Sequence, residues 1–132
     1  MNQALLLKIK KAINKKKEIF FAYLFGSQVE GKVGKLSDID IAVYLDPKIS
    51  EEKRFDLKLK ILEELAKNLK TENIDLVILN DAPPLLAHRI LKEGVLIFSK
   101  DEKERISYEV RAVLEYLDFK PLLEKYVRET FK

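Results

Sequence analysis

Continuous apolar runs and helically spaced apolar residues alternate along the chain, and together they predict a domain that mixes strands and helices. The strands are predicted at residues 19–25, 38–45, 74–79 and 95–98. The helices are predicted at residues 3–16, about 51–69, 84–92, from 101 onward, and in a last segment near 121–131. Asp118 and Pro121 mark the expected break between the last two helices, because proline disrupts a helix interior.

This order predicts an α/β (α+β) fold, in which a small mixed β-sheet of about four strands is flanked by helices and followed by a C-terminal helical pair. Ser50 is the predicted N-cap of the central helix. The buried face of that helix is expected to comprise Phe55, Leu59, Leu62, Ala66 and Leu69. A chain of 132 residues supports one domain, so we predict a single unit over 1–132, with a core at about 3–98 and helices at about 101–131.

Composition narrows the class of protein. Apolar residues make up 47% of the chain, which predicts a packed globule, and the lack of cysteine excludes disulfides and thiolate metal sites. No apolar run approaches the roughly 20 residues of a membrane helix. The N-terminal segment has no signal-peptide pattern, so we expect a cytoplasmic protein.

Charge adds little to this description. The 25 basic and 22 acidic residues leave a net charge of +3, which is too even for a strong nucleic-acid footprint, so direct nucleic-acid binding is not expected. Lysines near the first helix indicate a solvated face, with binding to RNA or polyphosphate as the alternative; they are Lys8, Lys10, Lys11, Lys15, Lys16 and Lys17. The many lysines and glutamates favour a thermophilic source.

A glycine and a serine follow the first predicted strand. Gly26 lacks a Cβ, so the backbone can approach a ligand closely at this point. Ser27 is expected to open a short helix, whose free N–H groups and positive dipole end suit a phosphate. The pair therefore predicts a phosphate-binding turn.

Two aspartates begin the second predicted strand. Residues two apart on a strand share a face, with Cα atoms roughly 6.6 Å apart, so Asp38 and Asp40 should present their carboxylates side by side. Such a pair can bridge two divalent cations about 3.5–4 Å apart, as nucleotidyl transfer requires. Asp75 interrupts the third apolar run, and a buried carboxylate there would need a partner or a metal. The alternative is an aspartate that faces water at a frayed strand start.

The motif Gly-Ser, ten residues, Asp-x-Asp, set between two strand-like runs, resembles that of the DNA polymerase β-like nucleotidyltransferase superfamily. The short chain resembles the minimal nucleotidyltransferase (MNT) members of the superfamily. The resemblance implies a nucleotidyltransferase fold and a two-metal enzyme that uses two Mg²⁺ ions and ATP or another nucleoside triphosphate. It assigns Asp38 and Asp40 to both metals, Asp75 to the metal beside the attacking hydroxyl, and Gly26 and Ser27 to the triphosphate.

The resemblance also implies a partner. MNT proteins are often encoded beside a HEPN-domain protein, whose toxicity they neutralise by contact or by transfer of AMP to a tyrosine. We therefore expect an antitoxin of this kind. The alternatives are a free-standing transferase for small molecules, similar to the aminoglycoside nucleotidyltransferases, and a catalytically silent binding module. The base preference, the oligomeric state and whether the chain forms a homo-oligomer are left open by the sequence.

One position departs from the family pattern. Many MNT proteins carry basic residues shortly after the Gly-Ser pair, whereas this chain has Gln28 and Glu30 there. The cations that could replace them are Lys32, Lys35 and Arg89. His88, which is the single histidine, is interpreted as a surface or partly buried residue rather than a catalyst.

Overall fold

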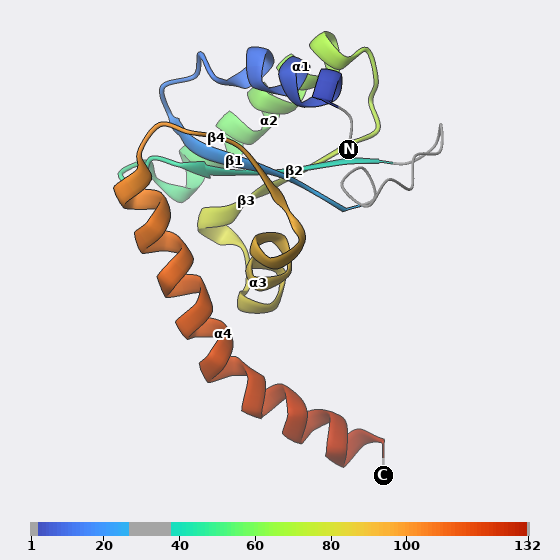
Figure 1. The fold of residues 1–132 in the computed structure, drawn as a ribbon, viewed down its shortest axis with the longest axis vertical. Helices are drawn as coiled ribbons and strands as arrows, with labels where there is room; N and C mark the ends of the chain where they lie inside the picture. Colours follow the sequence, from blue (N-terminus) through green and yellow to red (C-terminus); the bar gives the residue numbers. More distant parts are fainter. Residues whose placement is uncertain (1–2, 27–37, 132) are drawn as a thin grey trace.

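The computed structural model of the chain describes residues 3–26 and 38–131 (Figure 1). The elements in chain order are α1 (Gln3–Ile13), β1 (Ile19–Phe25), β2 (Ile39–Leu45), α2 (Glu51–Leu69), β3 (Ile74–Ile78), the 3₁₀ helix η2 (Leu79–Asp81), α3 (Pro84–Glu93), β4 (Val95–Ser99) and α4 (Glu102–Thr130). The predicted α+β architecture is confirmed. The short helix expected at Ser27 lies outside the described residues.

The four strands form one mixed sheet in the order β3-β2-β1-β4. β1 runs antiparallel to both of its neighbours, whereas β2 and β3 are parallel and joined by the crossover helix α2. A parallel pair needs such a crossover because the chain must return to the same edge before the next strand begins. As a result, β2 and β3 start at the same edge of the sheet, which is also the edge where β1 ends.

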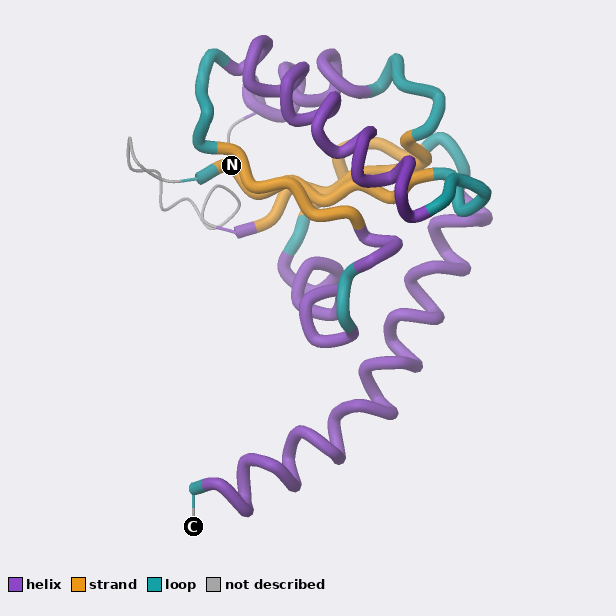
Figure 2. The backbone as a smooth tube through the Cα atoms, turned by 180° about the vertical axis from the view of Figure 1, so that it is seen from behind, coloured by secondary structure: helices purple, strands orange, loops and turns teal. Residues whose placement is uncertain are grey.

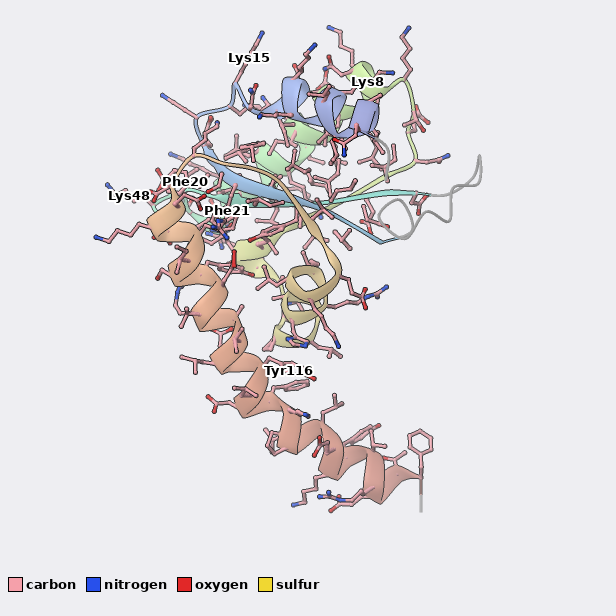
Figure 3. The ribbon with its side chains drawn as sticks, in the orientation of Figure 1. Lys8, Lys15, Phe20, Phe21, Lys48 and Tyr116 are labelled. Atoms are coloured by element: carbon pink, nitrogen blue, oxygen red, sulfur yellow. The ribbon has the colours of Figure 1, made fainter. Side chains whose placement is uncertain are left out.

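Helices cover both faces of the sheet. α1 and α2 lie over one face, and α3 with the first turns of α4 lies over the other (Figures 1 and 2). This arrangement explains why β1 is an almost unbroken apolar run, since its alternate residues enter two different cores. The lysines Lys8 and Lys15 point away from the sheet, as expected of a solvated face (Figure 3).

α2 has the predicted cap and only part of the predicted face. The Ser50 side chain accepts a hydrogen bond from the backbone N–H of Lys53 at 3.4 Å, which satisfies one free donor of the first turn. Leu62 and Leu69 of the predicted face are half-buried and pack against the core, whereas Phe55 and Leu59 are 62% and 52% exposed. The fully buried residues of α2 are Ile61 and Leu65. The prediction was wrong at the first two positions because two apolar stripes overlap along α2, and periodicity cannot tell which stripe meets the sheet.

The expected C-terminal helical pair is a single helix. α4 continues through Pro121 to Thr130, and its first turn is capped by Asp101, which accepts from the N–H of Glu104 at 3.0 Å. Proline removes one hydrogen bond, to the carbonyl four residues earlier, but this part of α4 is exposed and water can satisfy that carbonyl. The flanking residues favour a helix, so the helix is not interrupted.

The outer part of α4 extends away from the sheet (Figures 1 and 2). The first half of α4 carries an apolar stripe at helical spacing, and about half of the surface of each of its residues is exposed. We call this surface the α4 stripe; its members are Ile106, Val110, Val113 and Leu117, which are 54%, 53%, 47% and 54% exposed. No described helix is long and apolar enough to cross a membrane.

Candidate functional site

Asp40 and Asp75 lie side by side at the edge where β2 and β3 begin. They are direct partners in the parallel register, and each is the second residue of its strand. Because register partners share a face and neighbouring strands are about 4.8 Å apart, both carboxylates project from the α3 side of the sheet. Asp38 precedes β2 by one residue and is exposed. The register therefore gathers acidic side chains at one edge.

Asp75 is exposed rather than buried among apolar residues. Asp75 is the second residue of an edge strand, and its side chain is exposed while Leu76 and Ile78 are buried. The expectation of a buried carboxylate was therefore wrong, and the alternative of an aspartate that faces water at the strand start holds; its position next to Asp40 agrees with the grouping expected from the sequence.

Gly26 lies against Asp40. It follows Phe25, the register partner of Asp40, and it has a φ of +77°, in the region that favours glycine. A Cβ at this position would lie 2.1 Å from Oδ2 of Asp40. Because Gly26 has no side chain, its backbone at the end of β1 can lie in contact with the Asp40 carboxylate. Ser27 lies outside the described residues.

The local charge disfavours ionisation of Asp40. Burial raises the pKa of Asp40 above its ordinary value, and the neighbouring charges of Asp75 and Asp38 raise it further. The guanidinium of Arg89 on α3 acts in the opposite direction and lowers this pKa. Arg89 is therefore the described cation whose charge acts on Asp40, and the sequence alone could not place it there. Its side chain is 62% exposed and its Nε lies 3.4 Å from Glu93.

The donor set suits a hard cation bound together with a ligand. Among residues 3–26 and 38–131, no group of three or more acidic or histidine side chains is arranged to hold a metal ion. Mg²⁺, however, typically uses one or two carboxylates and completes its shell with waters and substrate phosphates. Asp40 and Asp75 supply two adjacent carboxylates whose mutual repulsion a cation would relieve. The residues therefore fit Mg²⁺ in the presence of a polyphosphate.

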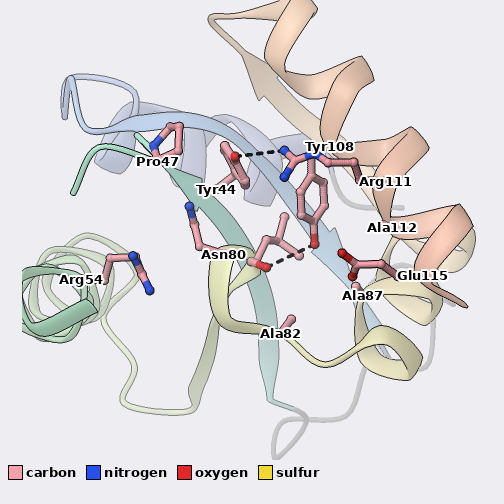
Figure 4. A pocket seen from close by; sticks show the side chains of 11 residues that line it. Tyr44, Pro47, Arg54, Asn80, Ala82, Ala87, Tyr108, Arg111, Ala112 and Glu115 are labelled. Carbon is pink, nitrogen blue, oxygen red and sulfur yellow. Dashed lines mark hydrogen bonds between the residues drawn. The ribbon is translucent and has the colours of Figure 1, made fainter. Parts of the chain in front are cut away.

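A separate cavity of about 260 Å³ lies at the other end of β2 (Figure 4). Tyr44 and Tyr108 line it, and the Tyr108 hydroxyl donates to the carbonyl of Leu79 at 3.2 Å. Arg54 also lines it and donates from Nε to Asp81 at 3.0 Å. Because these polar groups already bond to one another, we interpret the cavity as a structural junction between α2, η2 and α4.

His88 packs against Tyr116. The two rings stack with centroids 3.6 Å apart, and Tyr116 reaches from α4 toward α3 (Figure 3). His88 thus helps to hold α4 on α3, and it is half-buried, as expected.

Comparisons with known proteins agree with this geometry. The family model described as "Polymerase beta, Nucleotidyltransferase" matches residues 7–103, a span that includes β1, β2 and β3 and the acidic edge. One curated relative is the protein adenylyltransferase MntA of Aphanizomenon flos-aquae (strain 2012/KM1/D3). It is 27% identical over 110 residues, a match that covers 75% of this chain and 69% of the relative.

Solved structures share the fold over the whole chain. A toxin-antitoxin structure with AMP-PNP has a TM-score of 0.74 at 23% sequence identity and covers 100% of both chains. The complex of a tri-AMPylated Shewanella oneidensis HEPN toxin with its MNT antitoxin has a TM-score of 0.73 at 23% identity, again with full coverage. At this identity the likeness establishes the nucleotidyltransferase fold.

Proposed function

The chain belongs to the polymerase beta nucleotidyltransferase family, and we propose from this premise that it transfers AMP from ATP, with Mg²⁺, to a tyrosine hydroxyl of a HEPN toxin. In this role it is the antitoxin of a cytoplasmic toxin–antitoxin pair. The observation that carries the proposal is the pairing of Asp40 with Asp75 directly beside the bare backbone of Gly26.

The reaction forms a bond between the acceptor oxygen and the α-phosphorus and breaks the bond from that phosphorus to the bridging oxygen of pyrophosphate. In the proposed mechanism, Gly26 and Ser27 hold the β and γ phosphates. Asp38 and Asp40 would hold the two Mg²⁺ ions, and Asp75 lies beside the acceptor, where it takes the hydroxyl proton. The metal, when bound, neutralises charge on the triphosphate and lowers the pKa of the attacking hydroxyl.

Arg89 is the proposed replacement for the cations that the family usually places after the Gly-Ser pair. Its charge already acts on Asp40, and its contact with Glu93 is a long, solvent-exposed ion pair. Such pairs contribute little to stability, so the guanidinium is free to turn to a phosphate.

The partner is inferred from the relatives and from α4. A relative is named a protein adenylyltransferase, and structures of the same fold were solved with a HEPN toxin, one of them AMPylated. The α4 stripe gives this chain an apolar surface of the kind that a protein partner covers.

A transfer assay tests the proposal. The chain is incubated with Mg²⁺ and ATP labelled on the α-phosphate, with and without its proposed HEPN partner. We expect label on the HEPN protein, none after Asp38→Asn/Asp40→Asn, and undiminished label after Asp118→Asn, which changes an exposed carboxylate on α4. Full neutralisation of the toxin by the double variant, with no label from the wild type, would instead indicate a silent binding module.

A further inference from the structure

β3 is the last strand on one side of the sheet, and its lateral edge, which faces away from β2, has no strand partner among the described residues. The N–H of Ile39 donates to the carbonyl of Asn73 at 2.9 Å, which fixes the direction of the ladder. Backbone groups alternate in direction along a strand, so Asp75 and Val77 bond to β2, whereas Leu76 and Ile78 direct their N–H groups outward. Within the described part of the chain, this edge is therefore a short row of backbone groups without a hydrogen-bond partner.

A groove runs along this edge. A cavity of about 520 Å³ is bounded by α2 on one side and by the segment from Asp81 into α3 on the other. Its lining includes β3 itself from Asp75 to Ile78, together with Phe55, Lys58, Pro83 and Leu86. Phe55 belongs to the α2 face that the sequence predicted to be buried, and it is 62% exposed in this groove. The groove therefore offers an apolar wall beside unpaired backbone.

Asp75 lines the end of the groove that meets the acidic site, and its position indicates which molecule can bind in the groove. The phosphate turn at Gly26 lies on the β1 side of Asp40, whereas the groove lies on the far side of Asp75. A nucleotide bound at Gly26 and Asp40 leaves the groove empty. The group that must reach Asp75 from this side is the acceptor.

We propose that a segment of the acceptor protein binds in extended conformation along the free edge of β3, as an added strand, with its tyrosine hydroxyl beside Asp75. This inference rests on the proposed transfer to a protein tyrosine. The outward groups of Leu76 and Ile78 hydrogen-bond to the segment, which gives affinity with little demand on its sequence. Phe55 and Leu86 receive the side chains that alternate toward the groove.

Phe55→Ala tests the groove kinetically. The acceptor is the HEPN protein of the proposed function, and initial rates are measured with ATP labelled on the α-phosphate. We expect the KM for the HEPN protein to rise at least tenfold and the KM for ATP to stay within twofold. The matched control is Leu59→Ala, which removes a 52% exposed apolar side chain from the same helix outside the groove. Unchanged acceptor KM in Phe55→Ala overturns the proposal.

Hydrogen exchange separates this inference from the proposed function. With unlabelled HEPN protein and no ATP, the amides of Leu76 and Ile78 should exchange at least tenfold more slowly than in the free chain. The amide of Val77 is the internal control, because it bonds to β2 in both states. Protection of these two amides without any label transfer would support the groove and contradict the transferase activity. Label transfer without protection of these amides would support the activity and overturn the proposed binding along β3. Protection of the same amides by a second copy of the chain, in place of the HEPN protein, would also overturn it.

Discussion

The Asp40 carboxylate leaves no room for a side chain at position 26, and this contact gives a prediction about the two residues. We expect Gly26→Ala to lower the free energy of unfolding by more than about 2 kcal/mol, because it combines a left-handed conformation, worth about 1–2 kcal/mol, with a contact of 2.1 Å. In an Asp40→Ala background the offending oxygen is absent, so the loss should shrink to the conformational part. Denaturant titration of the four proteins gives the coupling, and an equal loss in both backgrounds would contradict the contact.

The ionised Asp40 carboxylate is expected to lower the stability of the fold while it is required for transfer. Asp40→Asn removes a carboxylate whose ionised form is disfavoured by burial and by Asp75 and Asp38. We therefore predict transfer below about 1% of wild type, as is common when a metal-binding or catalytic carboxylate is lost, together with an unfolding free energy that is unchanged or up to about 1 kcal/mol higher. Thermal melts without Mg²⁺ test this. A clear drop in melting temperature would indicate a structural role for the carboxylate instead.

The sequence was informative at these residues because the relevant spacing is local. Asp38 and Asp40 are two apart, so strand geometry alone predicts that they share a face, and Gly26 is recognisable as the end of an apolar run. The contact of Gly26 with Asp40 depends in addition on the antiparallel pairing of β1 with β2. The position of Asp75 required the further knowledge that its strand pairs in parallel with that of Asp40. Arg89 could not be placed, since nothing local to α3 says which edge of the sheet it approaches.

At the scale of elements, tyrosines fasten α4 to the sheet. The Tyr23 hydroxyl donates to Glu109 at 2.9 Å, and the Tyr44 hydroxyl donates to Glu104 at 2.7 Å. Phe21 stacks on Tyr44 with ring centroids 4.6 Å apart, and Tyr108 packs against both. The partners are 86 positions apart in the Tyr23–Glu109 bond and 60 positions apart in the Tyr44–Glu104 bond. No local sequence pattern could therefore indicate these contacts.

This attachment should weaken at alkaline pH. Burial, first of all, raises the pKa of Tyr23, Tyr44 and Tyr108 above the ordinary 10.0. Above pH 10 the unfolded chain releases these protons while the native state keeps them, so the free energy of unfolding falls as pH rises. The slope is at most about 1.4 kcal/mol per pH unit for each tyrosine. Tyr23→Phe should have a shallower slope than wild type in urea titrations between pH 9 and 11, and equal slopes would contradict the assignment.

Pro121 should weaken α4 without ending it. Proline is about 3 kcal/mol less favourable than alanine within a helix, so Pro121→Ala should raise the local opening free energy of the surrounding turns by about 1–3 kcal/mol. Amide exchange over residues 118–127 measures this. The global melting temperature should change little, because this part of α4 is exposed.

Elements were predicted where one physical effect dominates and missed where two compete. The strands follow from apolar runs that only a sheet covered on both faces can bury. At Pro121 the penalty of one missing hydrogen bond competes with favourable neighbours, and the neighbours prevail. On α2 two apolar stripes compete, and only contact with the sheet selects the one through Ile61 and Leu65.

At the scale of the whole molecule, the α4 stripe should govern assembly. We expect Val113→Glu to weaken binding of the HEPN protein at least tenfold, because the charge would be buried in an apolar contact. Binding of Mg²⁺-ATP should not change. Ser107→Glu, an exposed position beside the stripe, is the matched control. Calorimetric titration of both variants measures the two affinities, and equal HEPN affinities would place the contact elsewhere.

The exposed outer half of α4 also has a consequence for the life of the protein in a cell. A copy without its companion displays apolar surface on a helix that little else holds in place, and such surface is what chaperones and proteases act on. Copies of the chain that are not bound to the HEPN protein should therefore be degraded quickly, whereas copies in the complex persist. The abundance of this chain would then follow that of the HEPN protein, and a pause in synthesis would deplete the unbound copies first.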